Sequence, residues 1–250
     1  MTPKVDDWDQ HWTEFLKINS VAPATEFRRR TVEKLLEIQG TGKGVRILEI
    51  GAGTGTLAEE ASRTYPDAAF LGLDLSAISV KMCKKRVPTA EFRQRNLLEP
   101  PGPEDNLEFG ATHVVCSEVL EHVDDPVLLL RSALPYMAPG CKLVFTVPGG
   151  AISAFHKNLG HRRHYTAELL SDTLKKAGLR VKWSSGVGFP FFNIYWSLIV
   201  WRGEKAIQEV AGEPGLAIRA LGKVFGWLFH LTTMRAGWQI AGVAEYQPAK

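Results

Sequence analysis

The sequence predicts an α/β protein built on one doubly wound parallel sheet. Short apolar runs alternate with helical segments between residues 45 and 147, which is typical of strands joined by crossover helices. A turn with three glycines follows the first of these runs and lets a ligand approach the main chain closely. The 250 residues, of which 45% are hydrophobic, suit one domain with an insertion better than two independent domains.

The first strand is expected at residues 45–50, with a sharp turn into a helix that begins near Thr56. Alternate positions of the turn are glycines, namely Gly51, Gly53 and Gly55. Glycine bends without a Cβ clash, and the start of the next helix offers free N–H groups to a ligand. The turn therefore predicts a binding site.

Residues beside the glycines indicate the charge of that ligand. The dinucleotide fingerprint G-x-G-x-x-G would need glycine at position 56, where this chain has Thr56. Glu49 stands two residues before Gly51, and its carboxylate would repel a pyrophosphate but attract an ammonium or a sulfonium. The sequence therefore favours S-adenosylmethionine over a nicotinamide dinucleotide.

The turn resembles motif I of the class I S-adenosylmethionine-dependent methyltransferases. Four further segments follow at the intervals of that family, at residues 70–76, 91–97, 112–122 and 138–148. The resemblance implies that Asp74 binds the ribose hydroxyls of the cofactor. Asn96 stands where the family often has Asp against the adenine amino group, and its amide oxygen can accept the same hydrogen bond.

The same resemblance implies a Rossmann-like sheet of seven strands, mostly parallel and with an antiparallel last strand. It also implies S-adenosylmethionine as the cofactor. The residues expected to bind it are Glu49, Gly51, Ala52, Gly53, Gly55, Asp74, Leu75, Asn96, Leu97 and Ser117.

Four regions are expected along the chain. They are an N-terminal helical lid at 1–44, the cofactor-binding core at 45–183, an apolar helical insertion at 184–237, and the last core strand with a tail at 238–250. A helical segment is predicted there by apolar residues at helical spacing, namely Trp8, Trp12, Phe15 and Leu16, and the resemblance implies that it folds over the cofactor as a lid. These tryptophans could instead pack on the surface of the domain.

The insertion has three open interpretations. Residues 183–201 carry no charge, but glycine, proline and asparagine interrupt them, so we expect no membrane-spanning helix there. Farther along, one apolar stripe is formed by Leu221, Val224, Phe225, Leu228 and Phe229. The insertion could cap the substrate pocket, contact a membrane surface beside a lipid-like substrate, or form a homodimer interface.

Composition narrows the choice of partners. A net charge of +3 does not by itself indicate nucleic acid, so we expect a small-molecule substrate. Three cysteines without a C-x-x-C pair are typical of a reduced protein, and the polar N-terminus shows no secretory signal. We therefore expect a cytoplasmic protein, with peripheral membrane contact through 184–237 as an open alternative.

Two histidines are candidate general bases. His122 follows the fourth expected strand, at the sheet edge where doubly wound sheets bind ligands. His164 lies in Gly160-His-Arg-Arg-His-Tyr-Thr166, which resembles the H-x-R-x-Y-T signature of small-molecule methyltransferases. A hydroxyl acceptor needs a base to remove its proton. Either histidine could instead be structural, bonded to nearby backbone.

A metal site is the weaker interpretation of the same region. Glu118, Glu121 and His122 form E-x-x-E-H, and His161 and His164 follow, so carboxylates and imidazoles could hold a divalent cation. Small-RNA 3′-end methyltransferases and ubiquinone-biosynthesis O-methyltransferases have similar clusters. The segment equally resembles the signature of metal-free members, and we expect no metal.

The sequence thus predicts an enzyme that transfers a methyl group to a small molecule, and the resemblance favours an O-methyltransferase of the ubiquinone-biosynthesis type. The acceptor is expected to be a hydroxyl of an apolar, quinone-like, lipid-like or natural-product substrate. One alternative is a metal-assisted RNA 2′-O-methyltransferase. Another is a catalytically idle partner protein that binds the cofactor.

Overall fold

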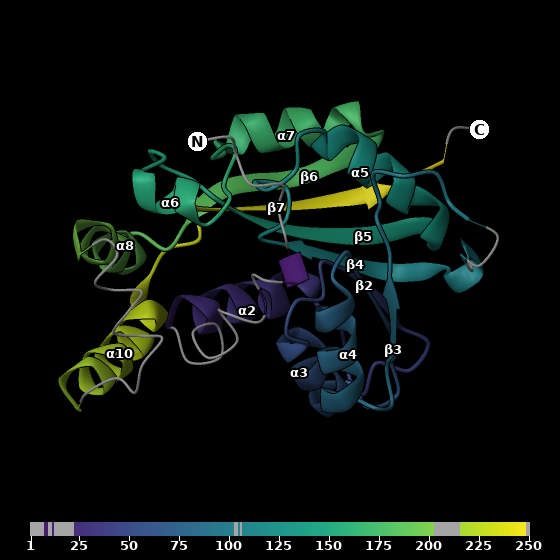
Figure 1. The fold of residues 1–250 in the computed structure, drawn as a ribbon, viewed down its shortest axis with the longest axis horizontal. Helices are drawn as coiled ribbons and strands as arrows, with labels where there is room; N and C mark the ends of the chain where they lie inside the picture. Colours follow the sequence, from purple (N-terminus) through teal and green to yellow (C-terminus); the bar gives the residue numbers. More distant parts are fainter. Residues whose placement is uncertain are drawn as a thin grey trace.

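The computed structural model describes residues 8–9, 12, 23–102, 105, 107–202 and 216–248, with the backbone alone at 154–155 and 216–219. Its centre is a seven-stranded sheet with the strand order β3-β2-β1-β4-β5-β7-β6. Helices α5 and α7 cover one face and α2, α3 and α4 the other, while α8 and α10 form one end of the molecule (Figure 1). The expected Rossmann-like α/β class is confirmed.

The strands are β1 Arg46–Ile50, β2 Ala69–Asp74, β3 Glu91–Gln94, β4 Ala111–Ser117, β5 Met137–Pro148, β6 Leu179–Val187 and β7 Gln239–Tyr246. The α-helices are α2 Pro23–Leu36, α3 Thr56–Thr64, α4 Ala77–Arg86, α5 Pro126–Ala133, α6 Ala154–Asn158, α7 Ala167–Lys176, α8 Phe191–Arg202 and α10 Leu216–Leu228. Short 3₁₀ turns are η1 Leu107–Phe109, η2 Leu134–Tyr136 and η3 Phe229–Leu231. Strand β7 runs antiparallel to both β5 and β6, as expected of the last strand.

Strand β1 packs against the helices on both faces of the sheet. Ile47 packs with Ala58 of α3 and Val80 of α4. Leu48 points to the opposite face, where it packs with the cluster that contains Leu130 of α5. Because successive side chains of a strand point to opposite faces, one apolar run serves both layers.

The turn after β1 has the backbone that its glycines predict. Gly51, Gly53 and Gly55 all have positive φ, at 78°, 55° and 74°. The amides of Gly51 and Ala52 donate to the Leu73 carbonyl of β2, which ties the turn to the end of the neighbouring strand. Helix α3 then starts at residue 56, as expected.

Strand β6 is longer than the apolar pattern predicts. The core was expected to give way to the insertion after residue 183, but β6 continues to Val187. Ser184 to Gly186 lack the alternation of a strand, and they pair with Gly242 to Ile240 of β7. The ladder to β7 therefore extends the strand where local propensity does not.

Among the described residues of the insertion, α8 and α10 with η3 dock on α2 through aromatic rings. Phe27 of α2 lies 4.7 Å from Phe192 of α8 and 5.3 Å from Phe229, measured between ring centroids. The expected stripe of α10 is divided, because Phe225 and Phe229 are 6% exposed whereas Val224 is 52% exposed. Among the residues described, no helix has the length and apolarity to cross a membrane.

Most of the expected N-terminal lid, including Phe15 and Leu16, lies outside the described residues. Helix α2 belongs to this region and packs on β4 and β5 through Val32 and Leu36. Trp12 reaches the glycine turn, since a Cβ on Gly53 would lie 3.0 Å from its ring.

We predict that the aromatic contact between α2 and the insertion contributes strongly to stability. Phe229→Ala should lower the free energy of unfolding by about 3–5 kcal/mol, because a buried ring leaves a cavity. Val224→Ala, on the exposed face of the same helical hairpin, should change it by less than about 0.5 kcal/mol. Urea unfolding of both variants checks this, and equal losses would contradict the packing described.

Candidate active site

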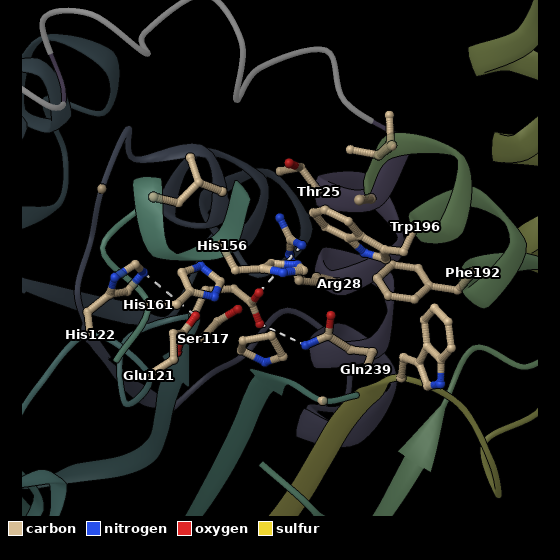
Figure 2. A pocket seen from close by; sticks show the side chains of 18 of the residues that line it. Thr25, Arg28, Ser117, Glu121, His122, His156, His161, Phe192, Trp196 and Gln239 are labelled. Carbon is tan, nitrogen blue, oxygen red and sulfur yellow. Dashed lines mark hydrogen bonds and ion pairs between the residues drawn. The ribbon is translucent and has the colours of Figure 1, made fainter. Parts of the chain in front are cut away.

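A cavity of about 710 Å³ opens at the carboxyl ends of β1, β4 and β5. Its walls come from the glycine turn, the loop after β4, helix α2 and helix α8. Figure 2 shows imidazoles on one side of this space and the aromatic rings of Phe192 and Trp196 on the other. Parallel α/β sheets bind ligands at this edge.

The end of the cavity beside β1 carries a buried carboxylate. Glu49 is 6% exposed and lines the cavity, and its Oε2 has no hydrogen-bond partner in the described structure. Burial, and then the charge of Asp74, raise the pKa of Glu49 well above its usual value. A buried carboxylate is costly without a partner, so this end of the cavity fits a ligand with a positive charge.

The glycine turn leaves room for that ligand. A Cβ on Gly51 would lie 2.4 Å from Cγ2 of Val119, so a larger residue would displace the loop after β4. Ala52 and Gly53 also line the cavity, and Ser117 borders it from the end of β4. Together with Glu49 these residues fit the amino-acid part of S-adenosylmethionine, whose ammonium would neutralise the carboxylate.

The other expected cofactor residues lie at neighbouring strand ends and not in the described lining of the cavity. Asp74 accepts hydrogen bonds from the amides of Gly53 and Ser76, at 2.8 and 2.9 Å. Asn96 bonds Glu99 and the amide of Leu98. Leu75 is exposed, whereas Leu97 is buried in the core. Gly55 packs against Cys83, to whose Sγ an added Cβ would lie 3.1 Å.

Glu118 joins three elements around the cavity. Its Oε1 accepts from Thr146 of β5 at 3.2 Å and from Gln239 of β7 at 2.7 Å. Its Oε2 lies 3.4 Å from Nη1 of Arg28 of α2. The residue holds a left-handed backbone with φ of 58°. Glu118 therefore orders the loop after β4, and Arg28 also lines the cavity.

The histidines come from two loops that are bonded together. The amide of Arg162 donates to the Glu121 carbonyl at 2.8 Å, and the Tyr165 hydroxyl donates to the Leu120 carbonyl at 3.2 Å. These bonds bring His161 to His122, with 4.8 Å between ring centroids. His122 lines the cavity, as expected of a candidate base.

His164 lies behind this pair and is not in the described lining of the cavity. Its Nδ1 lies 3.1 Å from the Gly150 carbonyl, which can only accept, so that nitrogen carries the proton. Its Nε2 then accepts from Nδ1 of His161, at 3.1 Å. A neutral His161 is thereby left with an unprotonated Nε2.

His156 was not singled out by the sequence, and it also lines the cavity. Its ring lies 4.5 Å from that of His164 and 5.7 Å from that of Trp196, between centroids. Burial, then the charge of His164, lower the pKa of His156 to about 4. Burial, then the neighbouring histidines, lower the pKa of His161 to about 2. Both rings are therefore neutral at pH 7.

One cluster has the composition of a metal site. Glu121, His122 and His161 each bring one ligand atom within 4.8 Å of the others. Glu121 is fully buried, and neither of its oxygens has a hydrogen-bond partner among the described residues. Burial, then the charge of Glu118, raise the pKa of Glu121 well above its usual value. A divalent cation could be held there, without Glu118, which is paired elsewhere.

The far end of the cavity is aromatic. Helix α8 contributes Phe192, Tyr195 and Trp196, and Trp238, just before β7, also lines the cavity. The apolar composition of residues 183–201 was visible in the sequence. Only the helical conformation of α8 shows which of these rings face the cavity.

The fold and this site define a class I S-adenosylmethionine-dependent methyltransferase. A sequence family described as a methyltransferase domain matches residues 23–182, and the chain belongs to it. The chain is 26% identical over 211 residues to a ubiquinone biosynthesis O-methyltransferase of Acinetobacter baylyi, over 76% of this chain and 83% of that protein. It is 34% identical over 99 residues to methyltransferase str2 of Strobilurus tenacellus, over 40% of this chain and 34% of that one.

Solved structures show the same fold. The geranyl diphosphate C-methyltransferase of Streptomyces coelicolor, in complex with Mg²⁺, a substrate thio-analogue and S-adenosylhomocysteine, aligns with a TM-score of 0.59 at 15% identity, over 97% of this chain and 82% of that chain. Phosphoethanolamine N-methyltransferase 2 of Haemonchus contortus, in complex with S-adenosylmethionine, aligns with a TM-score of 0.63 at 18% identity. The alignment covers 98% of this chain and 61% of that chain. Because the chain belongs to the methyltransferase-domain family matched at residues 23–182, S-adenosylmethionine is its cofactor.

We predict that the charge of Glu49 is needed to bind the cofactor. Glu49→Gln keeps the shape but removes the charge, so the Kd for S-adenosylmethionine should rise roughly 10- to 100-fold. Glu59→Gln, on the outer side of α3, should leave it unchanged. Titration calorimetry checks both, and an unchanged Kd for the Glu49 variant would contradict the cofactor placement.

Proposed function

We propose that this methyltransferase transfers the methyl group to a hydroxyl of an apolar small molecule, such as a quinone-like or lipid-like acceptor. The observation that carries the proposal is the cavity, which leads from Glu49 past the imidazoles of His122 and His161 to the aromatic wall of α8. Charged and proton-accepting groups occupy one part and apolar rings the other. An acceptor with a reactive hydroxyl on an apolar body matches this division.

The named relative supports the same acceptor class. The relative from Acinetobacter baylyi is a ubiquinone biosynthesis O-methyltransferase, and the match spans most of both chains. An RNA acceptor matches the site less well, because the aromatic wall offers no charge to a phosphodiester chain.

The residues of the glycine turn would hold the cofactor. Glu49 would bind the ammonium, and Gly51 and Gly53 would let the main chain approach it closely. Asp74 and Asn96 would bind the ribose and the adenine from the ends of β2 and β3. When bound, S-adenosylmethionine supplies an activated methyl group. The protein's remaining tasks are to align the acceptor, exclude water and remove a proton.

His122 would accept the acceptor's proton, because it lines the cavity beside His161. His161 suits this role less well, since burial and then the neighbouring histidines lower its pKa to about 2. Its ring, with Nδ1 donating to His164, would instead hold His122 in place in the wall.

The N-terminal region would act as the lid over this site. Trp8 and Trp12 line the cavity, and the ring of Trp8 lies 4.8 Å from that of His122, edge to face. Trp12 covers the glycine turn. Both rings would exclude water from the cofactor and the base.

A metal-assisted form of the same reaction is the second candidate. The observation in its favour is Glu121, a buried carboxylate without a hydrogen-bond partner in the described structure, beside the imidazoles of His122 and His161. A cation held by Glu121, His122 and His161 would bind the acceptor oxygen and favour its deprotonated form.

We predict that His122→Ala lowers kcat by about 10²- to 10⁴-fold with little change in cofactor affinity, because the proton acceptor is lost. His230→Ala, on η3 and away from the cavity lining, should keep kcat. Methyl transfer from labelled cofactor to a soluble catechol or hydroquinone measures both variants. Normal turnover of the His122 variant would rule out the proposed base.

Chelation separates the two candidates. Without a metal, dialysis against a chelator should leave kcat unchanged, because imidazole accepts the proton directly. A loss of more than about tenfold, restored by Mg²⁺ or Zn²⁺ and absent in Glu121→Gln, would establish the metal-assisted form.

A further inference from the structure

The outer face of α8, α10 and η3 is the largest gathering of exposed apolar side chains in the described structure. Most large hydrophobic residues that are exposed lie between residues 189 and 238, whereas the remaining four are scattered singly over the core. The gathered ones are Phe189, Ile194, Leu198, Trp201, Leu221, Val224, Trp227, Leu231 and Trp238. Single exposed apolar residues are ordinary, but a contiguous group marks an interaction surface.

Helix α8 shows that this face is not a by-product of core packing. Its inner side chains, Phe192 and Tyr195, pack on α2, α10 and η3 or line the cavity. Its outer side chains Ile194, Leu198 and Trp201 recur at intervals of four and three residues and are 47%, 40% and 83% exposed. A helix that is apolar all round needs an apolar environment on both sides.

The insertion that carries this face has a net positive charge. Residues 184–237 contain five arginines or lysines and three glutamates. Of the basic residues, Arg202, Lys223 and Arg235 are exposed in the described structure. Exposed tryptophans together with basic residues are the composition of a surface that enters the headgroup region of an anionic bilayer.

An anionic lipid surface supplies both the apolar environment that these side chains need and a charge opposite to that of Arg202, Lys223 and Arg235. A second copy of the chain is the competing occupant, and the vesicle experiment distinguishes the two.

We propose that the outer face of α8, α10 and η3 docks on an anionic lipid surface, from which an apolar acceptor enters the cavity. Trp201 and Trp238 connect the exposed apolar surface to the cavity, because each is exposed to solvent and also lines the cavity. The route of the acceptor rests on the proposed function, whereas the docking does not. Lipid contact at the cavity mouth would let an acceptor pass from bilayer to active site without crossing water.

Vesicle flotation tests the docking without any acceptor. The full chain is mixed with vesicles of phosphatidylcholine that contain about one third phosphatidylserine, or with vesicles of phosphatidylcholine alone. The test variant is Leu221→Ser with Trp227→Ser, on the outer face and away from the cavity lining. The matched control is Leu128→Ser with Leu169→Ser, whose side chains are 43% and 45% exposed on α5 and α7.

We expect the wild type and the control to float with the anionic vesicles, and the test variant to bind them at least about tenfold more weakly. Raising the salt concentration should weaken binding by screening. All three proteins should keep the same Kd for S-adenosylhomocysteine, which verifies the fold. Equal flotation of test variant and control, or none by the wild type, would overturn the proposal. So would a wild-type dimer that the test variant breaks and that binds no vesicles.

Activity towards a soluble acceptor separates this result from the proposed function. If the acceptor class is wrong, vesicle binding remains while no quinone-like or lipid-like hydroxyl is methylated. If the docking is wrong, the soluble acceptor is methylated equally by the wild type and by the Leu221→Ser, Trp227→Ser variant, and neither binds vesicles.

Discussion

The buried carboxylate of Glu49 is the constraint around which the rest of the site is arranged. It lies at the carboxyl end of the central strand β1, 6% exposed, and one of its oxygens has no hydrogen-bond partner in the described structure. Burial raises the pKa of such a group, and a cation beside it favours its charged form. The glycine turn beside it is bonded to Leu73 of β2, and in the proposed cofactor placement the ammonium of S-adenosylmethionine would reach Glu49 past this turn. The fold places the carboxylate of Glu49 at the end of β1, where its negative charge favours a cofactor with a positive charge.

The catalytic part of the site depends on a second arrangement, in which two loops are held together by backbone bonds. Arg162 and Tyr165 bond the loop that follows β4, and Glu118 ties that loop to β5, β7 and α2. Imidazoles distant in the chain therefore meet at one wall. Burial keeps His156 and His161 neutral, which suits metal binding, while proton acceptance is proposed for His122. Local chemistry alone does not choose between these two uses.

Helix α8 connects this chemistry to the outside of the molecule. Its inner rings, Phe192 and Trp196, line the acceptor end of the cavity, while its outer residues are exposed. Aromatic packing on Phe27 of α2 fixes the orientation of the helix. One apolar sequence can therefore form both the wall of a chamber and a face for lipid, because a helix presents different residues to its two sides.

The sequence by itself determined the order of strands and helices, the positive-φ turn at Gly51 and Gly53, and the charge preference set by Glu49. These features depend on residues within a few positions of one another, so local patterns record them. Only the tertiary structure decided that His161 and His156 line the cavity with His122 while His164 stands behind them. It also decided that β6 runs on to Val187 against β7. Such outcomes depend on contacts between distant segments, and no periodicity within one segment encodes which of its residues will meet another.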